Sequence, residues 1–438
     1  IQQLKKKNMK SVITCDMEGV ILTMNKGAEE IFGYDKNELI GLKRVSIFSP
    51  GEIVLQNVAN WLKTAVDKGE YNGETYFINK NKSKINAKIK ITPTYSKNTS
   101  NESVQTGYCG YTEVIDKNVN VPINFSTKLI KGLAITRMPF TSASIFPVMI
   151  VACYFAGIGD NLFSTPILVS SFFGILIAHL GLNVFNDYFD VKDGTDEYNA
   201  EYFQQVSGGS RAIELGLITL DNTKKLGLIL ITIAMLIGAY IFMNVNPLNL
   251  KFTILLTLAG LALGYFYTAP PLRLVARSGL GELSIFLAFG PLLTLGTGFA
   301  VYNGDFLNSP HFLNVLLLGI PVGFLTTNIL LINEFPDMVS DIKTNKNHLV
   351  VKFGKKNSRW LYLLFLILAF SSSILSSFLM NNNLITILSI TSLFFGLLIF
   401  KHIFKNYDNR ELVKSNWNTI TLHAIFSILL SLCLIFGF

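Results

Sequence analysis

Long uncharged and apolar runs recur along residues 138–438, whereas residues 1–137 alternate short apolar and polar stretches. A bilayer core about 30 Å thick requires roughly 20 apolar residues per helix. Runs of that size are found at 138–159, 161–186, 226–250, 252–272, 283–304, 312–333, 360–400 and 416–438. The 360–400 run is interrupted by Met380-Asn381-Asn382-Asn383, which predicts two helices with a tight turn between them. The pattern therefore predicts nine transmembrane helices after a soluble N-terminal domain.

Composition and charge support this division of the chain. Only 15% of the 438 residues are charged and 50% are hydrophobic, whereas a typical soluble domain is about 25% charged. Disordered, collagen-like and disulfide-scaffold classes are excluded, and the four cysteines show no paired or metal-type spacing. Residues 1–137 carry 20 Lys+Arg and 13 Asp+Glu, a net charge of +7, against 17 and 16, a net +1, in residues 138–438. The basic domain indicates a membrane surface, and not nucleic acid, as its partner.

Lysine and arginine predict the orientation of the nine helices. With the N-terminal domain inside, the loops after the second, fourth, sixth and eighth spans carry 4, 2, 6 and 4 of these residues, 16 in all. The opposite loops carry one, Lys251. Because positively charged loops stay in the cytoplasm, we expect an integral protein of the cell or inner membrane. Its N-terminal domain and the carboxyl ends of its even-numbered helices would face the cytoplasm.

Two groups of carboxylates follow apolar spans on that same side. Asp187 and Asp190 share one face of a helix in the stretch N-D-Y-F-D, and Asp337 and Asp341 are four residues apart. Clustered carboxylates repel one another unless a cation neutralises them, and Mg²⁺ prefers oxygen ligands and bridges to substrate phosphates. The alternative interpretation is two sets of solvated helix-end acids. Two clusters at matching helix ends on one membrane side favour an Mg²⁺ site.

Cationic residues stand near both clusters. Arg211 ends a Ser-Gly-Gly-Ser-Arg loop, Lys343 follows Asp341 by two residues, and Arg273 ends Tyr-Thr-Ala-Pro-Pro-Leu-Arg after the fourth span. Arginine side chains and glycine-rich backbone N–H groups bind anions, although each motif alone is also typical of an ordinary loop or a helix terminator. Together with the carboxylates, these cations predict a diphosphate held by Mg²⁺ at the membrane edge, with its apolar tail in the bilayer.

These motifs resemble those of the UbiA superfamily of intramembrane prenyltransferases. The resemblance rests on N-D-Y-F-D at 186–190, S-G-G-S-R at 207–211, Y-T-A-P-P-L-R at 267–273 and D-x-x-x-D at 337–341, in that order. The N-D-Y-x-D-x-x-x-G-x-D form at 186–196 and the G-G-S-R loop are most similar to the branch that prenylates 1,4-dihydroxy-2-naphthoate in menaquinone synthesis. Branches that use 4-hydroxybenzoate, homogentisate or glycerol-phosphate ethers remain open as alternatives.

The resemblance implies an all-α polytopic fold of nine transmembrane helices and an Mg²⁺-dependent polyprenyl transferase. The metal ligands would be Asp187, Asp190, Asp193, Asp196, Asp337 and Asp341. Contacts to the donor diphosphate would come from Asn186, Arg137, Arg211, Arg273 and Lys343. The catalytic candidates are Asp190, Asp337, Lys343 and Arg273. Metal and cations would stabilise the leaving pyrophosphate, and the allylic cation would alkylate an aromatic acceptor, with loss of CO₂ from a naphthoate.

Residues 1–116 resemble a PAS domain, an α+β fold. The pattern D-x-E-G-x-I-x-x-M-N-x-x-A-E-x-I-F-G-Y begins at Asp16; strand patterns are seen at 11–16, 20–24, 84–94 and 106–114, and a helical one at 25–32. Residues 1–137 contain no His, and Cys15 lies in the first strand, so neither haem nor a flavin adduct is favoured. We expect a cytosolic sensing module, or a docking and homodimerising module without a ligand. A linker or interfacial helix at 117–137 would join it to a prenyltransferase domain at 138–438.

Two functions of other classes also fit a polytopic protein with clustered acids. A transporter or channel would place its carboxylates in mid-membrane, whereas these acids follow the apolar spans. A membrane sensor would bind a prenyl diphosphate without turnover; the intact acid motifs oppose this hypothesis, and a turnover assay decides it.

Overall fold

A computed structural model describes residues 10–97, 101–192 and 209–437, and its internal contacts divide the chain into two compact units. The N-terminal unit comprises Ile1–Ile135 together with Ser210–Leu220. The membrane unit comprises Thr136–Gly209 and Asp221–Phe438. The chain therefore leaves the membrane unit once, between two of its long helices, to contribute a short segment to the N-terminal unit.

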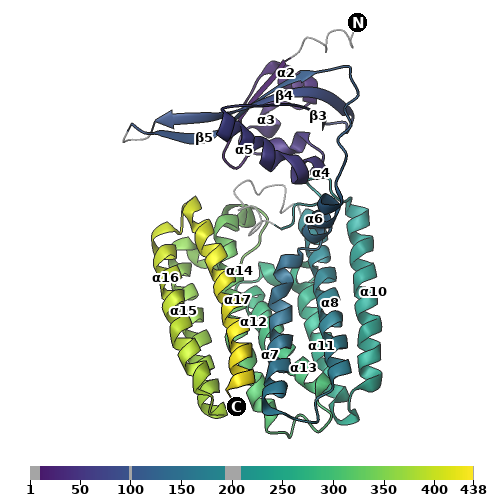
Figure 1. Ribbon diagram of the computed structural model, residues 1–438, viewed down its shortest axis with the longest axis vertical. Helices are drawn as coiled ribbons and strands as arrows, with labels where there is room; N and C mark the ends of the chain where they lie inside the picture. Colours follow the sequence, from purple (N-terminus) through teal and green to yellow (C-terminus); the bar gives the residue numbers. More distant parts are fainter. Residues whose placement is uncertain (1–9, 98–100, 193–208, 438) are drawn as a thin grey trace. The chain divides into compact units, whose positions relative to one another are not determined.

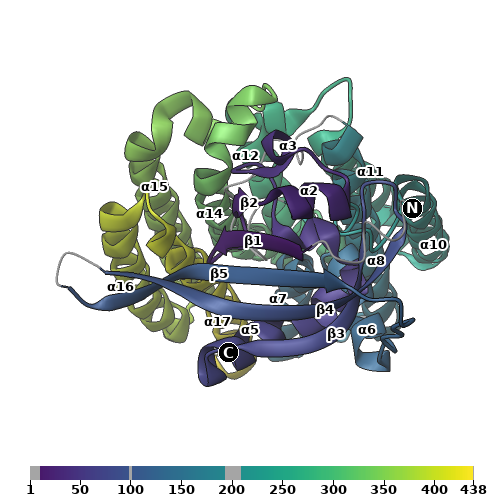
Figure 2. The same cartoon turned by 90° about the horizontal axis from the view of Figure 1, so that it is seen from above.

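The N-terminal unit is built on a five-stranded antiparallel sheet with the order β2-β1-β5-β4-β3 (Figure 2). Its strands are β1 (Lys10–Asp16), β2 (Ile21–Met24), β3 (Tyr71–Ile78), β4 (Lys84–Lys97) and β5 (Ser103–Val114). Four of them lie close to the strand patterns in the sequence. The fifth, β3, was not predicted, because most of its residues on both faces are half-exposed and its apolar alternation is weak.

Short helices of the N-terminal unit pack on this sheet. They are α2 (Lys26–Phe32), α3 (Lys36–Leu39), η1 (Val45–Phe48), α4 (Gly51–Ile53), the π-helical turn η2 (Val54–Val58) and α5 (Ala59–Lys68). Helix α6 (Phe125–Ile135) contacts α4 and η2 instead. Phe32 stacks on Phe48 with 4.2 Å between ring centroids, and its ring meets Phe77 of β3 edge to face. The α+β architecture implied by the PAS resemblance is confirmed.

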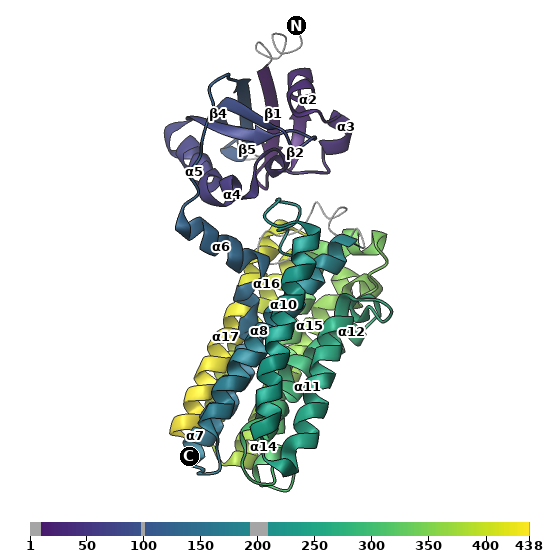
Figure 3. The same cartoon turned by 90° about the vertical axis from the view of Figure 1, so that its right-hand side faces the viewer.

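The membrane unit is a bundle of long helices (Figures 1 and 3). They are α7 (Ser142–Ile158), α8 (Thr165–Lys192), α10 (Leu220–Asn244), α11 (Pro247–Thr268), α12 (Leu280–Leu287) with η5 (Ala288–Leu292) and α13 (Leu293–Val301), α14 (His311–Lys343), α15 (Leu349–Met380), α16 (Asn383–Asn406), and η6 (Arg410–Leu412) with α17 (Val413–Phe436). The break at Asn381 and Asn382 separates α15 from α16, as the sequence predicted.

Within the described residues, eight helices are long and apolar enough to cross a bilayer. The first predicted span, 138–159, corresponds to α7 and is not among these eight, because a 3₁₀ turn, η3 (Met138–Thr141), occupies its expected start and leaves α7 only 17 residues. The count of nine is therefore approximate. A helix of 17 residues lies at the lower limit of the length that spans a bilayer.

Helix α14 lies at the centre of the membrane unit. In its most apolar window 72% of the residues are buried inside the protein, against 6% to 44% in the other long helices. Three glycines allow its close approach to η5 and to the two helices that flank η5. A Cβ on Gly290 of η5 would lie 2.6 Å from Gly319 O, one on Gly319 would lie 2.4 Å from Thr294 Oγ1 of α13, and one on Gly323 would lie 2.6 Å from Phe286 O of α12. Small residues let membrane helices approach closely in this way. The second aspartate cluster is thus carried on the most deeply packed helix.

Candidate active site

The first aspartate cluster lies in the last two turns of α8. The helix continues past the apolar run to Lys192, so Asn186, Asp187 and Asp190 are helical. Asp187 is buried, and its Oδ1 lies 3.7 Å from Arg137 Nη1. Asn186 Oδ1 accepts a hydrogen bond of 2.8 Å from Thr268 Oγ1 at the end of α11. These contacts connect the carboxyl end of α8 to α11 and to the segment before α7.

Arg137 stands between α6 and η3 with a left-handed backbone, φ +51°. The preceding residue also contacts α8, because Thr136 O accepts a hydrogen bond of 3.2 Å from Asn183 Nδ2. The structure therefore brings Arg137, which the resemblance indicated as a diphosphate contact, to within reach of the first cluster.

The second cluster occupies the last turns of α14. Asp337 is half-buried, and Asp341 is buried, with its Oδ2 lying 3.0 Å from His348 Nε2. His348 is the N-cap of α15, where its Nδ1 accepts a hydrogen bond of 3.3 Å from the Val351 N–H. A neutral imidazole that accepts this bond through Nδ1 carries its proton on Nε2, from which it can donate to Asp341. The imidazole thus holds the Asp341 carboxylate in one orientation.

Lys346, in the loop between α14 and α15, joins the two clusters. Its Nζ donates to Asp190 Oδ1 at 2.7 Å, and its backbone N–H donates to Asp341 O at 2.8 Å. Both side chains of the ion pair are largely buried, with 10% and 15% of their surface exposed. The prediction that the two clusters face one another at one end of the bundle is therefore supported by direct contacts between their neighbourhoods.

Two buried glutamates extend the acidic group. Glu282, at the start of α12, accepts a hydrogen bond of 2.7 Å from the Leu349 N–H through Oε1. Its other oxygen, Oε2, is buried and makes no hydrogen bond to any described residue. Glu334 is also buried, with Oε2 lying 3.4 Å from His348 Nδ1. The neighbouring loops are joined as well, since Ser278 Oγ donates to Asn347 O at 3.0 Å.

The structure does not test the roles predicted for the remaining site residues. Arg273 is half-buried after α11, in a left-handed conformation with φ +40°, and Lys343 is exposed in the last turn of α14. Arg211 belongs to the N-terminal unit, where its Nη1 lies 3.1 Å from Glu214 Oε2. Asp193 and Asp196 lie outside the described residues. Their predicted roles therefore stay predictions.

Sequence reasoning missed Glu282, Glu334, Lys346 and His348. Glu334 carried a usable signal, because it is an acid directly after an apolar run, in N-E-F-P-D. Glu282 carried a similar one, immediately before the run 283–304. Lys346 and His348 are recognised as site residues only from their contacts in the structure. Lys346, for example, contacts Asp190, which is 156 positions away in the chain.

The donor set of this site suits Mg²⁺. Its candidate ligands are carboxylate oxygens, and among the residues that the structure describes no three His, Cys, Asp or Glu side chains converge closely enough to hold a metal ion. Mg²⁺ commonly binds through one or two carboxylates, several waters and substrate phosphates. The buried Glu282 Oε2, which no described residue hydrogen-bonds, is a further oxygen available to a cation or its water. The residues present thus fit an ion that arrives with a phosphorylated substrate.

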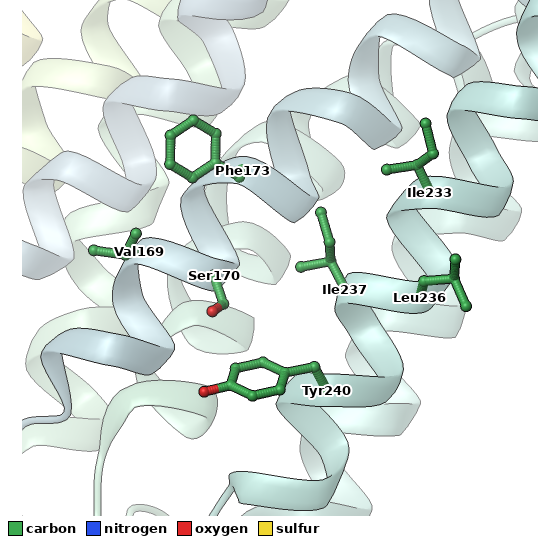
Figure 4. A pocket seen from close by; sticks show the side chains of 7 residues that line it. All are labelled: Val169, Ser170, Phe173, Ile233, Leu236, Ile237 and Tyr240. Carbon is green, nitrogen blue, oxygen red and sulfur yellow. The ribbon is translucent and has the colours of Figure 1, made fainter.

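A hollow of about 400 Å³ between α8 and α10 is separate from this site (Figure 4). It is lined by Val169, Ser170, Phe173, Ile233, Leu236, Ile237 and Tyr240. Phe173 precedes Asp187 by fourteen residues, about 21 Å along a helix at 1.5 Å per residue. Most of the lining side chains are exposed and apolar, so the hollow is a groove on the outer surface of the bundle and holds none of the predicted site residues.

Comparisons with known proteins agree with this arrangement. The UbiA prenyltransferase family matches residues 144–428, and the PAS domain family matches residues 9–108. The chain is 25% identical over 311 residues to the chloroplastic 2-carboxy-1,4-naphthoquinone phytyltransferase of Arabidopsis thaliana, covering 68% of this chain and 75% of that protein. It is 27% identical over 227 residues to 1,4-dihydroxy-2-naphthoate octaprenyltransferase of Bacillus subtilis, covering 51% and 66%. A UbiA homolog from Archaeoglobus fulgidus, solved with DMAPP and Mg²⁺, shares the fold with a TM-score of 0.50 at 15% identity, covering 70% and 99%.

Proposed function

The chain belongs to the UbiA prenyltransferase family, and from that premise we propose that it transfers a polyprenyl group to 1,4-dihydroxy-2-naphthoate with Mg²⁺ as its cofactor. It is an integral membrane prenyltransferase with a PAS domain. The observation that carries the finer proposal is Lys346, which contacts Asp190 through its side chain and Asp341 through its backbone. This residue thereby connects the end of α14, which carries the second cluster, to Asp190 of the first cluster.

The charges at that point suit the donor diphosphate. Asp187, Asp190, Asp337 and Asp341 would hold Mg²⁺, with Asp193 and Asp196 as the further predicted ligands. When bound, the ion would neutralise the phosphate oxygens and stabilise the leaving pyrophosphate. Positive charge for the remaining oxygens would come from Lys346 and Arg137, joined by Arg273 and Lys343, while Asn186 supplies an amide N–H. Arg211 belongs to the N-terminal unit, and its contact with the diphosphate stays a prediction from the sequence.

The proposed reaction breaks the allylic C–O bond of the donor, and pyrophosphate leaves with the electron pair. A ring carbon of the acceptor donates an electron pair to the allylic cation and forms the new C–C bond. For a naphthoate acceptor that carbon carries the carboxylate; the C–C bond to the carboxylate then breaks, CO₂ leaves and the electron pair restores the aromatic ring. The chain holds the leaving group by opposite charge, which favours the transition state in which that charge develops.

The acceptor rests on the relatives. Both named relatives above act on naphthalene-derived acids, as their names state. At 25% and 27% identity, homogentisate, 4-hydroxybenzoate and glycerol-phosphate ethers stay in the test as competing acceptors. The prenyl chain length is set by the length of the apolar path for the donor tail, and donors of several lengths belong in the same assay.

We further propose that the active site and the PAS domain face the cytoplasm, because the positively charged loops lie on that side. The PAS domain would then regulate the transferase or support a homodimer. Protease protection of the PAS domain in sealed, inside-out vesicles tests the orientation: cleavage from outside these vesicles supports it, and full protection contradicts it.

The function is tested with the full chain purified in detergent and supplied with Mg²⁺, geranylgeranyl diphosphate and each acceptor in turn. Mass spectrometry should detect a prenylated, decarboxylated naphthoate that requires both Mg²⁺ and protein. Product from a different acceptor would replace the naphthoate assignment. Binding of the donor with no product from any acceptor would favour the sensor hypothesis instead.

A further inference from the structure

One short helical stretch of the N-terminal unit holds the helix that leads into the membrane unit. The stretch Gly51–Val58, formed by α4 and η2, is here named the junction helix. Its Glu52 Oε1 accepts a hydrogen bond of 2.6 Å from Lys131 Nζ on α6. Gln56 makes three more contacts: its Nε2 donates to Pro122 O at 3.0 Å, and its Oε1 accepts from Thr127 Oγ1 and the Asn124 N–H, both at 2.9 Å. Figure 3 shows α6 below α4 and α5.

The same junction helix holds the second chain segment that connects the units. A Cβ built on Gly51 would lie 2.4 Å from Leu215 O and 2.6 Å from Leu217 Cδ2, so the 210–220 segment lies directly against this glycine. Leu217 is buried, with 4% of its surface exposed. This segment leads into α10, which begins at Leu220. Both connections between the units therefore attach to the same eight residues.

The α6 connection continues to the first aspartate cluster. Helix α6 ends at Ile135, and the next two residues already contact α8: Thr136 O accepts from Asn183 Nδ2, and Arg137 Nη1 lies 3.7 Å from Asp187 Oδ1. Four residues of helix and a two-residue extension thus separate the Lys131–Glu52 contact from the Arg137–Asp187 contact. Only Thr136 separates the end of α6 from Arg137, so the chain itself provides a short covalent path from the junction helix to this arginine.

We propose that the junction helix is the output surface of the PAS domain, which regulates prenyl transfer by setting the position of Arg137 against Asp187 through α6. This inference rests on the proposed function, since it concerns the donor site of that same reaction. Breaking the attachment of α6 frees Arg137 to move, so the affinity for the prenyl diphosphate falls. Mutations along physically connected networks change coupling by roughly 2- to 30-fold, and we expect an effect in that range.

The test uses the full chain in lipid nanodiscs. Gln56→Leu removes three contacts at nearly constant size, one to α6 and two to the residues just before it. Glu52→Lys places like charges at the second attachment, opposite Lys131. Two quantities are measured: hydrogen exchange of residues 125–141, and the dissociation constant of geranylgeranyl diphosphate with Mg²⁺. Both variants should increase exchange over α6 and η3 and weaken donor binding roughly 2- to 30-fold. The charge-reversed pair Glu52→Lys with Lys131→Glu should restore both quantities.

Glu38→Gln is the matched control, because it removes a 2.7 Å ion pair with Lys80 elsewhere in the N-terminal unit. It should change neither quantity. Increased exchange over α6 with unchanged donor binding would overturn the inference, as would unchanged exchange in both variants or failure of the charge-reversed pair to restore binding. The proposed function fails separately, when the parent chain forms no product with any acceptor. In that case the dissociation constant of the donor still tests whether the junction helix is coupled to the donor site.

Discussion

Lys346 Nζ lies 2.7 Å from Asp190 Oδ1, and this contact joins the loop after α14 to the last turn of α8. The two residues are 156 positions apart in the chain, and their side chains are largely buried. Removing one partner of a buried ion pair leaves an uncompensated charge. Lys346 therefore connects the two segments and places a positive charge beside Asp190 of the first cluster.

Lys346→Met should lower kcat/KM for prenyl transfer about 10- to 100-fold, since a hydrogen bond to a charged group contributes roughly 1.5–3 kcal/mol. Methionine keeps the length of the side chain and removes its charge. The matched control is Lys352→Met, because Lys352 is exposed six residues later. Steady-state kinetics at saturating Mg²⁺ measures kcat/KM for both variants. Equal losses of kcat/KM in Lys346→Met and Lys352→Met would show that Lys346 has no specific role in the site.

His348 is expected to act by positioning Asp341. His348→Ala removes both the hydrogen bond to Asp341 and the N-cap of α15. His348→Asn restores a good N-cap residue but is too short to reach Asp341. Both variants should raise the Mg²⁺ concentration needed for donor binding, whereas only His348→Ala should also lose about 1 kcal/mol of stability. Titration of Mg²⁺ by donor binding and thermal unfolding separate the two effects. Normal Mg²⁺ dependence in His348→Asn would contradict the positioning role.

Close packing of α14 predicts a contrast between two glycines. An alanine methyl at Gly319 would meet Thr294 Oγ1 at 2.4 Å and the Gly290 backbone at 2.9 Å, whereas nothing lies within 4 Å of the same position on Gly260. Overpacking of a tight interface costs typically 1–3 kcal/mol. Gly319→Ala should therefore lower the thermal midpoint of the purified chain by several degrees, and Gly260→Ala should leave it unchanged or raise it. Similar midpoints in the two variants would show that α14 is packed less tightly.

Cys15 is predicted to be an inert thiol. Burial in the first strand raises the pKa of the Cys15 thiol to about 11, whereas the pKa of a cysteine thiol in an unfolded chain is about 8.5. The fold thus favours the protonated thiol, so this contribution to stability is complete below about pH 8.5 and is lost as pH rises toward about 11. At pH 8 alkylation of Cys15 should be about 100-fold slower than in the urea-unfolded chain. Peptide mapping after iodoacetamide treatment measures this rate; equal rates would contradict the burial.

Much of the fold is readable from the sequence, because membrane helices are specified by local hydropathy. Apolar runs located all the long helices, and the helix-end acids at 187, 190, 337 and 341 were found by their contrast with those runs. Local pattern failed at particular places. Helix α7 is shortened by η3, and α8 extends six residues beyond its apolar run, with Asp187 and Phe189 buried in that extension.

The site was only partly predictable, because its key contacts are long-range. Arg137 precedes Asp187 by 50 positions yet lies 3.7 Å from its carboxylate. Lys346 was missed, whereas Lys343 was predicted from its position two residues after Asp341. The loop turns after Lys343 and brings Lys346 back to α8. The PAS domain was also only partly predictable. Its first strands and α2 were predicted from local sequence pattern, but the contact of Gly51 with Leu215 and Leu217 joins residues more than 160 positions apart.

The central claim is that the two aspartate clusters form one site for Mg²⁺ and the donor diphosphate. The most direct measurement is product formation from geranylgeranyl diphosphate and 1,4-dihydroxy-2-naphthoate by the parent chain and by Asp190→Ala and Asp337→Ala, each checked for correct folding by thermal unfolding. The account predicts a prenylated, decarboxylated product from the parent chain and a loss of at least about 100-fold in both variants, the scale seen when electrostatic stabilisation of a leaving group is removed. Full activity in either folded variant would contradict it, because that cluster would then take no part in the reaction.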